Sequence, residues 1–320
     1  MMDPELAHAS ENIARRCLGI AADEEVLVIC DPDTRGVGEA LRHAAIHAGA
    51  DTVLTIMQPR ATHGTEPPAS IAAAMLACDV YLAPTTFSLS HTQARKRASD
   101  HGVRGATLPG VTADLLGRLM SADLDRLGRR SGTIATLLSH GDRAEITCPL
   151  GSQMTIELTG RDAISDDGDL RAHGAFGNLP CGEAFIAPVS GQGQIFASSI
   201  ASVGLTLPPV ALTIADGQLS RADGDAGERL LQALTPHGPL AMNLAELGVG
   251  TNDRAMLTGN VLEDEKLLGS VHLAFGASAA IGGTVAVPIH LDVIVTEANL
   301  TIDGTRVLDQ GTLILDERRR

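Results

Sequence analysis

Short apolar runs alternate with helical stretches over the first 140 or so residues, and this alternation constrains the fold more than any other feature. Apolar runs at residues 26–30, 52–57, 80–84 and 103–108 are each followed by a segment with helical periodicity. Strands of this kind form a parallel sheet with helices on both faces. The sequence therefore predicts an α/β domain with a doubly wound, mostly parallel sheet. The segment lacks the G-x-G-x-x-G fingerprint, so we expect no dinucleotide-binding residues.

The pattern changes near residue 143, where segments of alternating polarity replace the α/β alternation. Residues 144–148 and 154–158 flank a turn and predict an antiparallel hairpin. A closing hairpin is predicted from residues 300–304 and 311–315. We place the domain boundary near residue 140. Residues 1–140 then form the α/β domain, and residues 141–320 form an α+β domain that is largely antiparallel sheet and carries the metal-binding catalytic residues.

The composition excludes several classes of function. A net charge of -15 with only 2% aromatic residues argues against a nucleic-acid partner. No apolar run approaches the ~18 residues of a membrane helix, and the start has no signal-peptide core. The five cysteines are scattered and never form a C-x-x-C pair, which predicts reduced thiols. We therefore expect a soluble, cytoplasmic protein without a membrane partner.

Several charged side chains lie in otherwise apolar segments of the second half. His290 and Asp292 are two residues apart in a predicted strand, so they point to the same face. His272 lies inside another apolar strand, Glu246 lies between apolar neighbours before a Gly-rich turn, and Glu183 lies in a Pro/Gly turn. A buried charge must be paired or bound to a metal ion. Together these residues suggest a metal centre built from carboxylates and imidazoles.

Each of these residues alone also has a plainer explanation. A lone buried histidine is more often hydrogen-bonded in the core than a metal ligand, and a turn glutamate is often exposed. The combined set is more specific, because imidazole and carboxylate without thiolate suit Zn, Mn, Co or Fe(II). Five ligands favour two metals bridged by a carboxylate. However, His272, His290 and Asp292 alone form the 2-His-1-carboxylate set typical of non-haem Fe(II) oxygenases.

Two further segments could contribute to a site. The charged run Glu263–Lys266 would ordinarily be a solvated turn, but one of its acids, Glu265, could serve as a general base. The segment Ser88–Thr92 and the basic residues Arg95–Arg97 lie at a predicted helix start and could contact a substrate carboxylate. A helix N-cap with a solvated basic face is the plainer explanation of the second segment.

Four blocks of the sequence resemble the M29 metallo-aminopeptidases, also called the aminopeptidase T or thermophilic metallopeptidase family. Leu179–Pro188 resembles their LPxGEvfxAP motif, and Glu246–Asn252 resembles ELGxGTN. Glu263–Gly276 resembles EDEKxxGTxHxAxG, and His290–Asp292 matches HxD. The resemblance is strong over the second domain, where all four blocks occur in the family's order.

This resemblance implies a two-metal aminopeptidase with Zn, Co or Mn, in which a metal-activated water attacks an N-terminal peptide bond. By position, the implied metal ligands are Glu183, Glu246, His272, His290 and Asp292, with Glu246 as the bridge. Glu246 and Glu265 are then the catalytic candidates, with Glu265 as the acid that takes and returns the proton. The family also implies a homodimer that acts on a short peptide or another small molecule.

The sequence departs from the peptidases at one place. They carry a Tyr shortly after the histidine of the third block, whereas residues 276–283 contain none. A short branch of the superfamily, similar to 2,5-dihydroxypyridine 5,6-dioxygenase, uses one Fe(II) and O2 to cleave aromatic rings. Its iron triad maps onto His272, His290 and Asp292, with Glu183 toward substrate and Glu246 orienting ligands.

The leading prediction from the sequence is therefore an M29-like metallo-aminopeptidase. The alternative is a mononuclear non-haem Fe(II) dioxygenase of the extradiol type that cleaves a hydroxylated, pyridine-like ring. A non-enzymatic metal-binding protein is the least favoured hypothesis, because five convergent ligands on a folded scaffold normally support chemistry.

Overall fold

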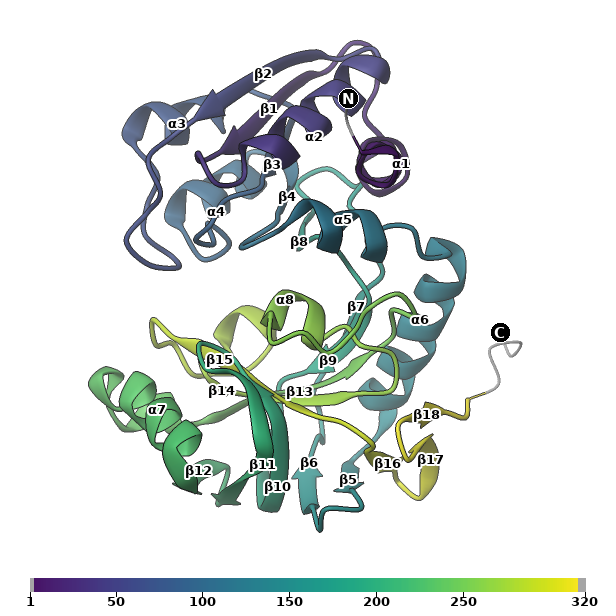
Figure 1. The fold of residues 1–320 in the computed structure, drawn as a ribbon, viewed down its shortest axis with the longest axis vertical. Coiled ribbons are helices and arrows are strands. Elements are labelled where there is room, and N and C mark those ends of the chain that lie inside the picture. Colours follow the sequence, from purple (N-terminus) through teal and green to yellow (C-terminus); the bar gives the residue numbers. More distant parts are fainter. Residues whose placement is uncertain (1–2, 316–320) are drawn as a thin grey trace. The chain divides into compact units, whose positions relative to one another are not determined.

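The computed structural model describes residues 3–315, which divide into two compact units (Figure 1). The first unit contains the chain up to Leu124 and the segment Gly168–Cys181. The second contains Asp125–Asp167 and the chain from Gly182 onward. The boundary predicted near residue 140 lies at the end of helix α6 (Leu124–His140), whereas the two units divide at the start of this helix. No local sequence pattern indicates that residues 168–181 belong to the first unit.

The first unit contains a five-stranded parallel sheet in the order β2-β1-β3-β4-β8. Its strands are β1 (Glu25–Cys30), β2 (Asp51–Ile56), β3 (Val80–Ala83), β4 (Arg104–Thr107) and β8 (Phe176–Asn178). Its α-helices are α1 (Pro4–Asn12), α2 (Arg35–His47), α3 (Ala69–Ala74), α4 (Gln93–Asp100) and α5 (Ala113–Leu119). A π-helical turn, Ile13–Cys17, follows α1.

Helices cover both faces of this parallel sheet. On one face Leu27 and Tyr81 pack in a buried cluster with Ile71 of α3 and with residues of α4. On the other face helix α2 packs on β1 and β2, and Gly38 lies against the Cys30 side chain (Figure 1). The predicted doubly wound α/β domain is thereby confirmed.

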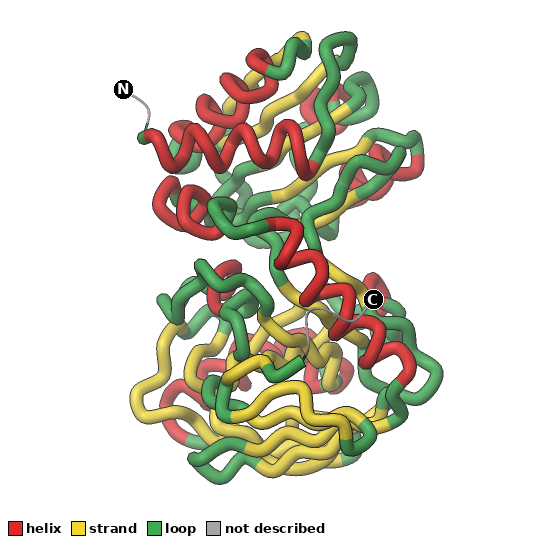
Figure 2. Tube along the Cα trace, turned by 90° about the vertical axis from the view of Figure 1, so that its right-hand side faces the viewer, coloured by secondary structure: helices red, strands yellow, loops and turns green. Residues whose placement is uncertain are grey.

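The second unit is built on a 13-stranded sheet, and strands predominate in it (Figure 2). Its main path runs β18-β17-β16-β5-β6-β10-β15-β14-β13-β9-β7, and β11 and β12 extend from β10. The strands in the first part of this unit are β5 (Arg143–Thr147), β6 (Gln153–Glu157), β7 (Ile164–Asp166), β9 (Glu183–Ile186), β10 (Ser190–Ile200), β11 (Gly204–Ala215) and β12 (Gln218–Ala222). The later strands are β13 (Leu244–Gly250), β14 (Val271–Gly276), β15 (His290–Val295), β16 (Asn299–Ile302), β17 (Thr305–Asp309) and β18 (Thr312–Leu313).

Few helices accompany this sheet. They are α6, α7 (Gly224–Leu234), α8 (Val261–Asp264) and the 3-10 turns Thr235–His237, Pro239–Met242 and Ala279–Ile281. The strand pairings of this sheet are antiparallel, as predicted for the second half. One face of the central strands, with Leu247, Leu273 and Val293, packs in the main apolar core. The opposite face of the same strands is therefore free to carry polar groups.

The two predicted hairpins of this unit have different outcomes. Strands β5 and β6 pair as predicted, with Ala144 opposite Ile156. The closing hairpin was predicted wrongly, because β16 pairs with β17, and β17 then pairs with β18. Asp303 and Gly304 have φ of 46° and 77°, the left-handed conformation of a two-residue hairpin turn. The chain reverses direction at this Asp-Gly pair, and the next residues form β17, a strand that the prediction did not contain.

In the part of the chain between residues 3 and 315, no helix is long and apolar enough to cross a membrane.

The packing of Tyr81 on β4 predicts a measurable penalty for adding one methyl group. Tyr81 lies opposite Gly105 in the β3–β4 register, and a Cβ at position 105 would lie 2.4 Å from its ring. We expect Gly105→Ala to lower the free energy of unfolding by about 1–3 kcal/mol through overpacking. Gly36→Ala, in α2 where an added Cβ meets nothing within 4 Å, should stabilise instead. Urea unfolding would measure both, and a neutral Gly105→Ala would contradict the packing.

Candidate metal centre

The strand register of the second unit places the predicted ligands on one face of the sheet. Residues that lie opposite each other in an antiparallel pair point to the same face. In the β14–β15 pair, Ala274 lies opposite Asp292, so His272 and His290, each two residues away in its strand, share that face. In the β13–β14 pair, Glu246 lies opposite Ala274. Side chains from three neighbouring strands thus converge on one surface.

Two more strands extend the same polar face. Glu183 at the start of β9 lies opposite Gly250 of β13, and Asp166 at the end of β7 lies opposite Glu183. Since Gly250 is four residues after Glu246, both positions face the same way. The face therefore collects carboxylates from β7, β9, β13 and β15. Asp166 was not among the predicted site residues.

A glycine opens the space that this cluster needs. Gly248 lies opposite His272, and a Cβ at position 248 would lie 2.0 Å from the Nε2 atom of His272. Any other residue at position 248 would therefore displace the imidazole. This contact explains one glycine of the Glu246–Asn252 block in structural terms.

Glu246 is at the centre of the polar cluster. Its Oε1 atom lies 3.2 Å from His272 Nε2, and its Oε2 atom lies 3.3 Å from His290 Nε2. Asp292 Oδ1 lies 3.5 Å from His290 Nε2, and Glu183 Oε2 lies 3.2 Å from His272 Nε2. The structure thus brings together all five predicted ligands.

The arrangement fits a divalent cation. Two sets of potential ligand atoms each lie within 4.8 Å of one another, and both sets contain Glu246. The first set is Glu183, Glu246 and His272, and the second is Glu246, His290 and Asp292. The Nδ1–H of His290 can donate to the Ala277 carbonyl at 2.7 Å, which leaves Nε2 as the acceptor for a metal. Within the described chain, Glu183 Oε2 is buried without a hydrogen-bond donor.

A buried lysine completes the cluster, and the sequence analysis did not single it out. Lys266 is 0% exposed, and its Nζ lies 3.1 Å from Glu183 Oε1 and 2.5 Å from Glu265 Oε1. Asp166 Oδ2 lies 4.0 Å from the same nitrogen. Because Lys266 belongs to a run of four charged residues, the pattern favoured a solvated turn. The apolar sequence directly after Lys266 was the only signal against a solvated turn.

Backbone amides donate hydrogen bonds to two buried acids of the charged run, Glu263 and Asp264. Glu263 Oε1 accepts from the Met256 amide at 2.7 Å, and Asp264 Oδ1 accepts from the Thr258 amide at 2.7 Å. Both side chains therefore fix the loop that precedes α8. Glu265, the predicted base, reaches the cluster together with Lys266, and the Glu265 side chain is 13% exposed.

Burial and close charges shift the pKa values of the cluster. Burial alone would raise the pKa of Glu246, but hydrogen bonds from His272 and His290 outweigh it and bring the pKa to about 2. Burial would lower the pKa of His272, but Glu246 and Glu183 raise it to about 9. For Asp166 and Glu265, burial dominates over the Lys266 charge and raises both pKa values to about 8.

The charge balance of the cluster depends on whether a metal ion is bound, because imidazoles that bind a metal must be neutral. The cluster contains five carboxylates, Asp166, Glu183, Glu246, Glu265 and Asp292, against His272, His290 and Lys266. Neutral imidazoles, which metal binding requires, would leave Lys266 as the single positive charge in this set. A bound divalent ion would offset the excess negative charge and favour the ionised carboxylates.

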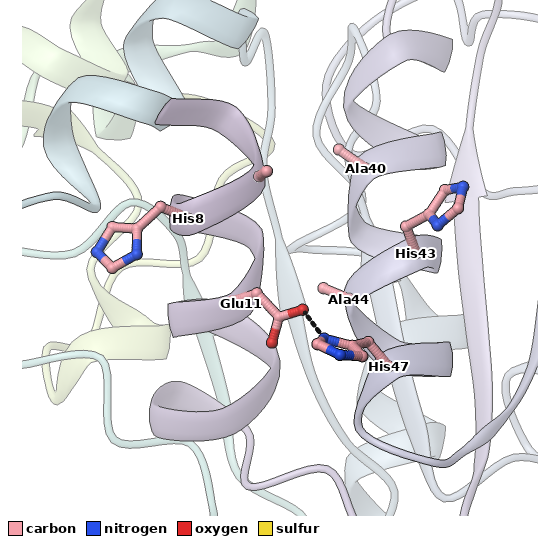
Figure 3. A pocket seen from close by; sticks show the side chains of 7 residues that line it. His8, Glu11, Ala40, His43, Ala44 and His47 are labelled. Atoms are coloured by element: carbon pink, nitrogen blue, oxygen red, sulfur yellow. Dashed lines mark hydrogen bonds and ion pairs between the residues drawn. The ribbon is translucent and has the colours of Figure 1, made fainter. Parts of the chain in front are cut away.

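Two other polar regions do not assemble a comparable ligand set. In the first unit, Thr92 caps α4 by accepting from the Arg95 amide at 3.2 Å, which is the plainer explanation of that segment. A hollow between α1 and α2 is lined by histidines, but Figure 3 shows His8 and His43 pointing to opposite sides. In the same hollow His47 is paired with Glu11 at 2.7 Å.

Comparison with known proteins finds one matching family and two similar solved structures. The family model for 2,5-dihydroxypyridine 5,6-dioxygenase (NicX) matches residues 5–315. The solved structure of 2,5-dihydroxypyridine dioxygenase from Pseudomonas putida KT2440 is similar, with a TM-score of 0.83, 18% identity and 98% coverage of each chain. Wild-type AmpT from Thermus thermophilus is similar with a TM-score of 0.70, 17% identity and coverage of 97% of this chain and 99% of that one. No match was found among curated protein sequences.

The family match confirms the resemblance to the dioxygenase branch, and the two solved structures confirm the predicted combination of α/β and largely antiparallel folds.

The contact between Gly248 and His272 predicts that an added methyl group disrupts the cluster. We expect Gly248→Ala to move the His272 ring and to weaken Co2+ binding by at least about tenfold, because a Cβ would overlap Nε2. Gly132→Ala in α6, where nothing lies within 4 Å, should leave binding unchanged. Isothermal titration with Co2+ would measure both variants, and equal affinity in the two would contradict this geometry.

The pKa shifts also predict how the stability of the metal-free protein depends on pH. His272, Asp166 and Glu265 have raised pKa values, so their stabilising contributions are present at low pH and are lost as pH rises through the folded-state values. We expect the melting temperature of the metal-free protein to fall by about 5 °C or more between about pH 6.5 and pH 9. Glu265→Gln should reduce this fall. A melting temperature that rises with pH over this range would contradict the raised pKa values.

Proposed function

Because this chain belongs to the 2,5-dihydroxypyridine 5,6-dioxygenase (NicX) family, we propose that it is a mononuclear non-haem Fe(II) dioxygenase that opens a hydroxylated, pyridine-like ring. The observation that carries the proposal is the convergence of His272, His290 and Asp292 on one sheet face, in a chain that matches the family over residues 5–315. The absence of a Tyr from residues 276–283 agrees with this assignment. The dioxygenase therefore replaces the aminopeptidase as the favoured function.

Each residue of the cluster has a role in this proposal. His272, His290 and Asp292 would hold the iron, and Glu246 would orient the two imidazoles through its two oxygens. Bound iron would supply the redox chemistry that joins O2 to the ring. Glu265 would accept the proton of a ring hydroxyl, since its metal-free pKa of about 8 would fall toward neutral pH beside a bound cation. Glu183 would face both the bound iron and the substrate through Oε2, which lies 3.2 Å from His272 Nε2.

The proposed reaction balances without an external reductant. One carbon–carbon bond of the ring breaks, two carbon–oxygen bonds form, and both atoms of O2 enter the product. The ring supplies the electrons, so the substrate must be electron-rich, as a ring with hydroxyl groups is. The hydroxyl proton that Glu265 accepts returns to the opened product.

A two-metal aminopeptidase is the second candidate, and one observation favours it. Glu246 belongs to both sets of potential ligand atoms, as a carboxylate that bridges two ions would. The fold is also similar to that of AmpT. We retain a homodimer as a proposal for either activity, to be tested by sedimentation.

Metal content and oxygen uptake distinguish the two candidates. We expect protein purified without oxygen or chelators to contain about one Fe per chain and to consume one O2 per hydroxylated pyridine opened. Two Zn, Co or Mn ions per chain, with release of N-terminal residues from peptides and no oxygen uptake, would overturn the dioxygenase proposal.

Two variants test the ligand assignment. Asp292→Asn should weaken Fe2+ binding by about 100-fold or more, because it removes a charged ligand. Asp216→Asn serves as the control, since Asp216 lies at an exposed turn with φ of 50°, which Asn tolerates. Glu246→Gln should leave one iron in place if the triad binds it, whereas it should abolish a bridged pair. Metal analysis after gel filtration would measure all three.

A further inference from the structure

Lysine is rare in this chain, and one of its two lysines is completely buried. Of the 24 lysine and arginine residues, two are lysines, Lys96 and Lys266. Lys96 lies in the exposed basic part of α4, whereas the Lys266 side chain is 0% exposed. An ammonium is a compact point charge, while a guanidinium is planar and larger. The use of lysine at position 266 therefore fits a site that requires a small cation.

Lys266 contacts the carboxylate of Glu183, which in turn contacts His272 of the cluster. Its Nζ lies 3.1 Å from Glu183 Oε1, and the second oxygen of the same carboxylate, Oε2, lies 3.2 Å from His272 Nε2. The two oxygens of Glu183 thus have different environments. One is engaged by the lysine, and the other faces the potential metal ligands.

The backbone holds Lys266 firmly in this position. Its carbonyl accepts from the Asn252 amide at 2.9 Å, and its own amide donates to the Glu263 carbonyl at 2.9 Å. The neighbouring Leu268 amide donates to the Asn252 carbonyl at 3.1 Å. Asn252 follows β13, the strand that carries Glu246. The lysine is therefore fixed to the strand at the centre of the cluster.

We propose that Lys266 is a positioning residue of the metal centre, which holds Glu183 through Oε1 so that Oε2 is presented to the bound cation. The same ammonium holds Glu265 beside the cluster. Glu183 then acts through one oxygen only, because the lysine occupies the other. The inference rests on the proposed metal centre, but it does not depend on whether that centre performs dioxygenase or peptidase chemistry.

The test compares Lys266→Met with Lys96→Met, using Co2+ alone as the probe. Methionine keeps much of the side-chain length and removes the charge. In Lys266→Met we expect Glu183 to lose its fixed orientation, so Co2+ affinity should fall at least about tenfold and the visible Co2+ absorption should change. Lys96→Met should match the wild type in both. Circular dichroism would establish that each variant is folded.

A folded Lys266→Met with unchanged Co2+ affinity and spectrum would overturn this inference and leave the proposed function intact. Wild-type protein that binds no Co2+, Zn2+ or Fe2+ would overturn both. Lys266→Arg provides a further control, since it keeps the charge but changes the shape, and we expect it to restore only part of the affinity.

A second measurement on the wild-type chain applies even if Lys266→Met does not fold. Protein labelled with 13C at the lysine ε-carbon should give two signals, one for each lysine. Saturation with diamagnetic Zn2+ should shift the Lys266 signal, because the charge on Glu183 redistributes toward the ion, and should leave Lys96 unmoved. A Lys266 signal that stays in place when Zn2+ binds would overturn the inference.

Discussion

Repulsion among five carboxylates that lie close together, two of them buried and three half-buried, is the constraint on which the polar cluster of the second unit depends. Charges brought together away from water are tolerated only when opposite charges offset them. In the metal-free protein the two imidazoles and Lys266 can offset this charge, and a divalent cation would take over from the imidazoles once they are neutral. The opposite face of the same strands packs in the apolar core. The sheet thus separates an apolar side from a side that carries the charged groups.

The sheet also fixes the relative positions of the candidate ligands. Ligands on paired strands are held by the hydrogen-bond ladder, so their separation is set by register rather than by flexible loops. Glu246 lies between the two histidines and could either orient them around one ion or bridge two. The similarity of the fold to both a dioxygenase and AmpT agrees with this view.

Local sequence patterns predicted much of the molecule, and long-range contacts account for what they missed. Apolar alternation predicted the parallel sheet, and isolated charges in apolar strands predicted Glu246, His272 and Asp292. The Asp303–Gly304 pair is a local turn signal, and the predicted closing hairpin omitted it together with β17. Lys266 looked like part of a solvated run, because its burial depends on Glu183, 83 residues away in sequence. Asp166 carried no local signal at all.

Anomalous X-ray scattering from crystals grown without oxygen would test the central claim most directly. Data collected on both sides of the iron edge would locate any iron and distinguish it from zinc. We predict one iron peak at about 2.0–2.3 Å from the ligand atoms of His272, His290 and Asp292. The absence of any metal peak at this cluster, in protein that retains its metal, would contradict the account.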